Sequence, residues 1–349
     1  MAEKSAPARR KGRLKKMALT LAFILLFYIA GSMAAAFIVP DVVFVRSEPR
    51  PEDLEIPYSE FSIPRRETGF MSGSNELRGY YYGAESARGL IVFVHGFRSG
   101  ADAHLPEIER FVSGSWSVFA FDGTGSRESG GAGTVGLPQM KYDLLHALEF
   151  AESEFPGLPV VLYGHSQGAY AAAAVLDDRP EISAAVLVAG FDSPIELMLY
   201  HARREAGFFA DLESPFLALQ NYMTFGKDGN EKASDAISSG ETPVLIIRGD
   251  SDEVVPEELS IASGEIKDPN AAYLVLPGGH SDLWLTRDAV DRRAAAETRL
   301  FELHAEHGDT LPDEVWEEFL SGVDIAGLWE TDEDFFSAVL SFFEGAVSR

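Results

Sequence analysis

Short apolar runs alternate with longer amphipathic stretches over most of this chain, from about residue 77 onward. Seven runs predict strands: Leu77–Tyr82, Leu90–Val94, Ser117–Phe121, Val160–Tyr163, Ala184–Ala189, Val244–Ile247 and Ala272–Leu276. The runs that begin at 90, 160, 184 and 244 are almost wholly apolar, as expected for strands that are covered on both faces. Helices are predicted near 138–155, 168–178, 256–266 and 333–346. This alternation is typical of an α/β fold with a mostly parallel central sheet flanked by helices.

The first 39 residues have a different pattern, a basic tail followed by one long apolar run. Residues 1–16 hold seven Lys and Arg against a single Glu, and residues 17–39 hold no charged side chain. A helix over this run extends roughly 34 Å, enough to cross a hydrocarbon core of about 30 Å. Because basic flanks stay on the cytoplasmic side, we expect a single-pass anchor in the cell membrane with an extracytoplasmic body.

Two other interpretations of this run stay open. The small residues at 31–36 are compatible with a signal peptide whose cleavage would release a secreted protein. A helix buried in a globular core is the third interpretation. We interpret residues 1–16 as a cytoplasmic tail, 17–39 as a transmembrane helix, 40–55 as a tether and 56–349 as the main domain.

Two segments of the main domain depart from the alternation of strands and helices. The segment from about 193 to 240 is rich in aromatic and aliphatic residues, whereas the segment from about 284 to 330 is charged and helical. The first segment follows a predicted strand at the sheet edge toward which the serine motif described below also points. We therefore predict that 193–240 forms a helical lid and that 284–330 is a helical insertion.

Charge and cysteine content narrow the possible partners. The 349 residues carry a formal net charge of −26, which disfavours nucleic acid as a partner and strongly anionic substrates. Cysteine is absent, which excludes disulfides, thiolate nucleophiles and cysteine metal sites.

A single motif carries the strongest chemical signal. Gly164-His165-Ser166-Gln167-Gly168 lies between the apolar run at 160–163 and an alanine-rich stretch that predicts a helix. A serine in such a strand–turn–helix element is lifted above the sheet, and the following helix directs its N-terminus toward developing negative charge. We therefore assign Ser166 as the candidate nucleophile.

Three further loops, in the same chain order, complete a resemblance to the α/β-hydrolase superfamily over roughly residues 70–345. Val92–Phe97 resembles the end of the oxyanion strand, Arg248–Pro256 resembles the acid loop, and Pro277–His280 resembles the histidine loop. The pattern is most similar to serine esterases and monoacylglycerol-lipase-like hydrolases, and more distantly to serine aminopeptidases. The resemblance implies an α/β-hydrolase fold and the chain order serine, aspartate, histidine.

The resemblance and the chemistry together suggest a role for each residue. His280 is the expected general base, and Asp252 is the expected carboxylate that orients it. The backbone N–H groups of Phe97 and Gln167 are expected to form the oxyanion hole. Asp250 is the main rival for the acid, and Asp192 is a third candidate.

The expected reaction is the hydrolysis of a carboxylic ester through an acyl-enzyme, with no metal and no organic cofactor. The apolar composition of the predicted lid suggests a small hydrophobic or lipid-like ester as substrate. A serine aminopeptidase is the alternative, since carboxylates in the lid would bind a substrate amine; the candidates are Glu196, Glu205, Asp211 and Glu213. A catalytically silent binding module is the remaining hypothesis.

Overall fold

One eight-stranded sheet organises the main domain of the computed structural model, which describes residues 6–84, 86–264, 266 and 269–348. Its strands lie in the order β1-β2-β4-β3-β5-β6-β7-β8. The pairs β1–β2 and β2–β4 are antiparallel, and the other five pairs are parallel. The strands are β1 (Arg65–Ser72), β2 (Asn75–Tyr82), β3 (Leu90–Val94), β4 (Ser117–Phe121), β5 (Val160–His165), β6 (Ala184–Val188), β7 (Val244–Gly249) and β8 (Ala271–Leu276).

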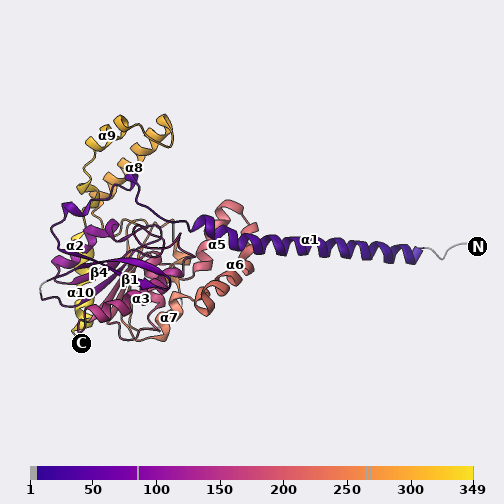
Figure 1. Ribbon diagram of the computed structural model, residues 1–349, viewed down its shortest axis with the longest axis horizontal. Helices are drawn as coiled ribbons and strands as arrows, with labels where there is room; N and C mark the ends of the chain where they lie inside the picture. The colour runs from indigo at the N-terminus through magenta and orange to yellow at the C-terminus, as the bar shows by residue number, and fades with distance from the viewer. Residues whose placement is uncertain (1–5, 85, 265, 267–268, 349) are drawn as a thin grey trace, which may run out of the picture.

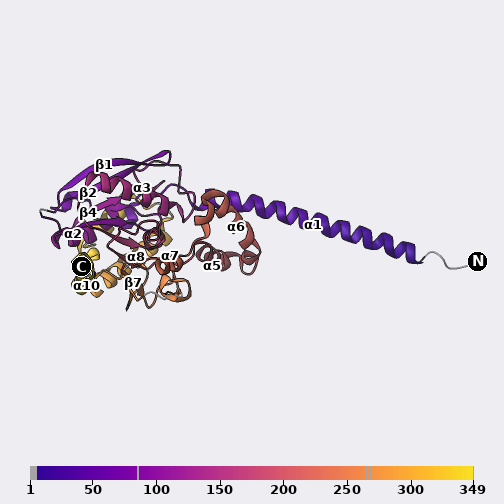
Figure 2. The ribbon, with the colours of Figure 1, turned by 90° about the horizontal axis from the view of Figure 1, so that it is seen from below.

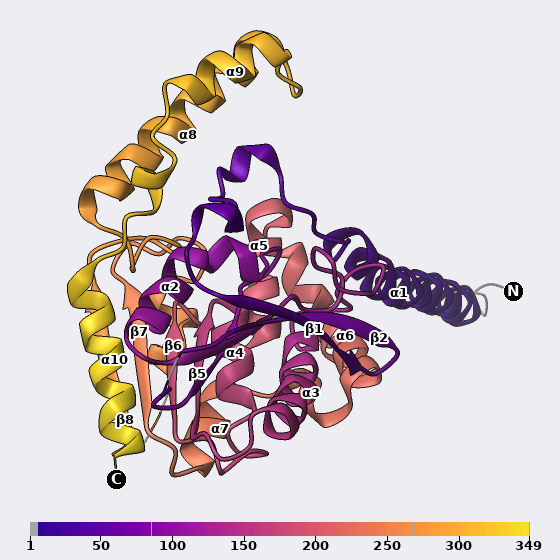
Figure 3. The ribbon, with the colours of Figure 1, turned by 60° about the vertical axis from the view of Figure 1, so that its left-hand side comes forward.

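Helices cover both faces of this sheet and enclose two apolar cores (Figure 3). One face carries α3 (Gln139–Glu154), α4 (Gln167–Ala174) and α7 (Ala233–Ser239). The other face carries α2 (Leu105–Ser113) and α10 (Glu333–Val347). The central strands β3, β4 and β6 are fully buried, which explains their uninterrupted apolar sequence.

The N-terminal helix α1 (Ala6–Val43) projects away from this body (Figure 1). It is long and apolar enough to cross a membrane, and only 11% of its most apolar window is buried. The predicted transmembrane segment lies inside it. Of the predicted basic tail, residues 1–5 lie outside the described residues. A helix of this kind near the N-terminus is compatible with an anchor and with a signal sequence.

The segment after α1, residues 44–55, crosses the body in close contact with it; we call it the strap. Phe44 and Leu54 are buried, and the backbone of Ser47 forms an isolated parallel β-bridge with Ser126. The Arg127 guanidinium pairs with the Glu55 carboxylate, with one N–H···O distance of 2.9 Å. The segment interpreted as a tether is therefore packed against the domain.

Two helical excursions leave the sheet on different sides of the molecule (Figures 1 and 2). The hairpin, α5 (Pro194–Ala206) and α6 (Phe209–Phe225), lies beside α1. The arm, α8 (Arg287–His307), α9 (Asp313–Ser321) and a 3₁₀ turn at Ala326–Trp329, extends away from the sheet above the strap (Figure 3).

The predicted strands are found within two residues of their expected ends, but two local predictions were wrong. Strand β1 was not predicted, because it is an edge strand that begins with four polar residues and contains no continuous apolar run. No α-helix forms over 256–266 in its described part; two 3₁₀ turns, Glu257–Leu259 and Ile261–Ser263, occur instead. Ser260 between them has extended backbone angles, and its side chain caps the second turn.

Candidate active site

Ser166 occupies a strained turn between β5 and α4. Its backbone has φ 54° and ψ −114°, an arrangement that side-chain-bearing residues rarely adopt. The neighbouring glycines permit it, because a Cβ at Gly164 would lie 2.4 Å from the Gly168 carbonyl oxygen and one at Gly168 would lie 2.1 Å from the Val94 carbonyl oxygen. The glycines of the motif are therefore required by the close approach of three backbone segments.

His280 lies between Ser166 and Asp252. Its Nε2 is 2.9 Å from the Ser166 Oγ, and its Nδ1 is 2.8 Å from the Asp252 Oδ2. The second oxygen of Asp252 accepts hydrogen bonds from the N–H groups of Val254 and Val255, at 2.9 and 2.8 Å. These bonds fix the carboxylate, which in turn orients the imidazole ring. The structure thus brings together the serine, histidine and aspartate that the sequence suggested.

The two rival aspartates have other contacts. Asp250 accepts a hydrogen bond from the N–H of Gly278, at 3.1 Å, and so holds the loop that carries His280. Asp192 accepts one from the N–H of Ser234, at 2.8 Å, at the start of α7. Among the described residues, neither aspartate contacts the imidazole of His280.

The predicted oxyanion donors lie on either side of the nucleophile. Gln167 is the first residue of α4, and Phe97 lies in the loop after β3. A Cβ placed on Gly96, next to Phe97, would lie 3.3 Å from the Ser166 Cβ, so this loop packs directly against the serine. Within the described part of the chain, the backbone N–H groups of Phe97 and Gln167 donate no intramolecular hydrogen bond. Both are therefore available to a ligand oxygen.

Two buried histidines support these loops in their neutral form. His95 accepts a hydrogen bond from the N–H of Gly123 at Nε2, so its Nδ1 carries the proton donated to the Gly96 carbonyl. Burial lowers the pKa of His95 to about 3. His165 Nε2 donates to the His280 carbonyl at 2.9 Å, and burial followed by the nearby His280 lowers its pKa well below the usual value. Among the described residues, neither ring forms a hydrogen bond with the Ser166 Oγ, so both histidines contact the loops and not the nucleophile.

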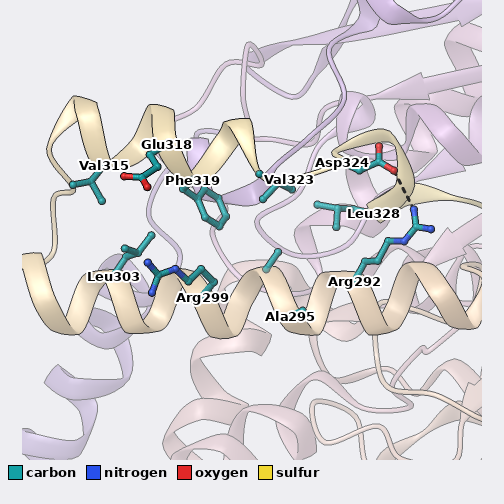
Figure 4. Close-up of a pocket in the computed structure, with 12 residues that line it drawn as sticks. Arg292, Ala295, Arg299, Leu303, Val315, Glu318, Phe319, Val323, Asp324 and Leu328 are labelled. Atoms are coloured by element: carbon teal, nitrogen blue, oxygen red, sulfur yellow. Dashed lines mark hydrogen bonds and ion pairs between the residues drawn. The ribbon is translucent and has the colours of Figure 1, made fainter.

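A cavity of about 800 Å³ opens over Ser166 and His280. Its walls come from the strap, the 96–99 loop and the arm. The arm contributes Arg293, Glu297, Leu300 and Trp329. A second cavity, of about 500 Å³, lies between α8 and α9 and includes the Arg292–Asp324 ion pair (Figure 4). It contains none of the three candidate catalytic residues, so the first cavity is the candidate substrate site.

The predicted lid does not line this cavity. None of the four carboxylates proposed to bind a substrate amine is among its wall residues. Glu196 pairs with Lys232 at 3.3 Å, and Asp211 accepts a hydrogen bond from Arg203 at 2.7 Å. In their place, the strap and the arm cover the site.

Comparisons with known proteins agree with this fold. Residues 85–218 match the family model described as serine aminopeptidase, S33. An esterase from Pyrococcus furiosus is similar in structure, with a TM-score of 0.51, 18% identity, and coverage of 75% of this chain and 98% of that one. The esterase Est1E from Butyrivibrio proteoclasticus, solved with ferulic acid bound, has a TM-score of 0.50 and 18% identity, with coverage of 68% and 99%. No curated protein sequence matches.

The chain has the α/β-hydrolase fold. The residues of the candidate site that the sequence did not reveal are the cavity residues of the strap and the arm. One signal was present: Leu54 is apolar within an otherwise charged stretch, and it packs in the arm's small core with Leu300, Leu303 and Phe319.

Proposed function

We propose that this α/β hydrolase is a membrane-anchored serine hydrolase that cleaves carboxylic esters through an acyl-enzyme. The observation that carries the proposal is the hydrogen-bonded series Ser166 Oγ, His280 Nε2, His280 Nδ1 and Asp252 Oδ2, with separations of 2.9 and 2.8 Å. This is the arrangement that activates a serine hydroxyl for attack on a carbonyl carbon.

Each proposed step uses a group of this chain. His280 Nε2 accepts the Ser166 proton as Oγ bonds to the ester carbonyl carbon. The N–H groups of Phe97 and Gln167 stabilise the oxyanion, at the N-terminus of α4. His280 then protonates the departing alkoxide, which leaves as an alcohol. The acyl group remains bound to the Ser166 Oγ as the acyl-enzyme. Water, deprotonated by His280, attacks the acyl carbon, so that the carboxylic acid departs and Ser166 regains its proton.

The cavity supports a substrate with an apolar part. Trp284, Leu300 and Trp329 supply aromatic and aliphatic walls. We therefore propose that a hydrophobic acyl group of the substrate binds beside these three side chains. The apolar hairpin is not the source of this preference, because it does not line the cavity.

A serine aminopeptidase is the second candidate, favoured by one observation. Glu297 on α8 lines the cavity and is exposed there, so a carboxylate is available to a substrate amine. A comparison of p-nitrophenyl esters with aminoacyl anilides separates the two reactions. Preference for esters, unaffected by Glu297→Gln, supports the esterase; preference for anilides that Glu297→Gln abolishes would replace it.

Fluorophosphonate labelling of the full chain tests the nucleophile directly. We expect labelling of the native protein and none of Ser166→Ala. Absence of labelling in native, folded protein would favour the catalytically silent binding module.

A matched pair of variants tests the acid. Asp252→Asn should lower kcat by about 10⁴-fold, because the imidazole loses its orienting carboxylate. Asp250→Asn is the control at the neighbouring position, and we expect it to retain most of the activity. The reverse order of effects would assign the acid to Asp250.

A further inference from the structure

The helix α6 exposes an apolar stripe where a surface helix ordinarily exposes polar residues. Its outward positions repeat every three to four residues, the period of one helix face. Phe208, just before the helix, is 67% exposed, Phe209 is 61% exposed and Met223 is 62% exposed. Leu212, Leu219 and Tyr222 continue the same stripe. Within α6 only Asp211 and Glu213 are charged. An apolar patch of this kind marks a surface that another apolar phase covers.

The helix α6 lies beside α1, the helix that is expected to cross the membrane (Figures 1 and 2). The Tyr28 hydroxyl donates to the Leu212 carbonyl at 2.6 Å, and its ring contacts Phe216 with centroids 5.7 Å apart. Ser32 and Ala36, one turn apart on α1, are buried. Small residues at such spacing allow two helices to approach closely in a membrane.

The position of these contacts along α1 sets the depth of the hairpin. Tyr28 lies twelve residues after Lys16, the last basic residue before the apolar run, which is roughly 18 Å along the helix axis. A hydrocarbon core of about 30 Å that starts after Lys16 ends near residue 36. Tyr28 and its partner Leu212 would then lie roughly 12 Å inside the outer boundary of the core.

We propose that the tip of the hairpin, around residues 207–223, is embedded in the outer leaflet beside α1, with lipid acyl chains covering the stripe. The proposal rests on the retention of α1 as an anchor, which is part of the proposed function. Some of the charged and polar groups nearby are paired. Arg203 binds Asp211 at 2.7 Å, and the Ser32 hydroxyl donates to Glu213 at 2.9 Å.

Labels at single cysteines test this depth, because the chain contains no native cysteine. Phe209→Cys and Met223→Cys report on the stripe, and Phe27→Cys reports on the anchor. Phe301→Cys on α8 is the matched control, since Phe301 is 76% exposed on the arm, away from α1. The full-length variants are labelled with bimane and reconstituted into phosphatidylcholine–phosphatidylglycerol vesicles that carry a nitroxide partway down the acyl chain. Retained fluorophosphonate labelling shows that each variant is folded.

We expect the labels at 27, 209 and 223 to lose most of their fluorescence and the label at 301 to keep it. Quenching at 27 with none at 209 and 223 would overturn the embedded hairpin while leaving the anchor in place. Absence of quenching at 27 would reject the anchor and the hairpin together. Protection of 209 and 223 from both the nitroxide lipid and aqueous iodide would assign the stripe to contact with a second copy of the chain, which also overturns the proposal.

Discussion

The hairpin and the arm are both helical excursions from one sheet, yet they differ in composition and in what they contact. The hairpin is aromatic and aliphatic, packs against α1 and leaves its apolar side chains exposed. The arm is charged on its surface, packs against the strap through Leu54 and supplies wall residues to the cavity over Ser166. The excursion nearest to the chemistry is therefore the less apolar one.

This difference separates two tasks that a single lid often combines. An apolar segment near an active site is readily interpreted as an acyl-binding surface. Here the apolar segment contacts the N-terminal helix, and the cavity over Ser166 is lined by the polar strap and the arm. The strap joins the two regions, since it continues directly from α1 and ends under the arm.

The largest expected effect on stability follows from detaching the strap. Arg127→Gln removes the partner of Glu55, and both side chains are mostly buried, with 11% and 19% exposed. Loss of one member of such a pair leaves the other charge without compensation, so unfolding by denaturant should show a loss of about 3 kcal/mol. Ester hydrolysis should fall as well, because Glu55 and its neighbours form one wall of the cavity.

Two further variants identify the cause of that loss. Glu55→Gln combined with Arg127→Gln should recover part of the stability, since no unpaired charge remains. Arg179→Gln is the control: Arg179 has a similar exposure of 13% and pairs with Glu152 and Glu181, away from the cavity. Equal loss of activity in Arg179→Gln would mean that the effect is general destabilisation and that the strap has no special role.

A smaller effect is expected from the arm itself. The Trp329 indole donates to the Leu54 carbonyl at 2.8 Å, and the Arg293 guanidinium lies 4.5 Å from its ring centroid. Trp329→Ala should raise KM for an aryl ester about tenfold, which corresponds to about 1.4 kcal/mol. Trp329→Phe should reverse the part of the KM increase that arises from loss of the aromatic ring.

The hairpin provides the contrasting variant for the same assay. Phe209→Ser should leave the kinetics on a water-soluble ester unchanged, because Phe209 does not line the cavity. It should instead weaken retention on vesicles. If Phe209→Ser changes KM as much as Trp329→Ala does, the division of tasks between hairpin and arm is wrong.

The sequence predicted the sheet well because its central strands are uniformly apolar. Val92, Leu162 and Val186 are completely buried, so their residue types directly reflect their environment. The three candidate catalytic residues, Ser166, Asp252 and His280, could also be proposed from the sequence, since each lies in a short segment whose local sequence is distinctive. In both cases the information is local, and a few consecutive residues suffice.

The cavity walls could not be predicted because they depend on contacts between segments far apart in the chain. Leu54 meets Trp329 across 275 positions, and no local pattern in either segment indicates the other. The surface that the apolar face of the hairpin contacts could not be predicted from the sequence for a related reason. Apolar residues at helical spacing predict one apolar face, but the pattern is the same whether that face meets a sheet, a lid or a lipid phase.

A different kind of effect, a pH dependence of stability, is expected from the buried carboxyl of Asp122. Burial raises the pKa of Asp122 from 3.8 to about 6, although the Ala101 N–H and the nearby Arg127 favour its charged form. A carboxyl that is protonated more easily in the folded chain contributes stability that is complete below pH 3.8 and lost as the pH rises to about 6. His95 acts in the opposite direction. Its folded pKa of about 3 lies below the usual 6.5, so its contribution is complete above pH 6.5 and lost as the pH falls.

In Asp122→Asn, the pH dependence of the free energy of unfolding should therefore show the effect of His95 without the opposing effect of Asp122. The amide oxygen can still accept from the Ala101 N–H, and the amide N–H can donate to Tyr80, which contacts Asp122 at 3.1 Å. Between pH 3.8 and about 6, the free energy of unfolding should rise with pH more steeply in the variant than in the native chain, by about 1 kcal/mol per pH unit. Denaturant titrations across this range measure that slope. Equal slopes in the two proteins would mean that Asp122 titrates normally and that burial does not perturb it.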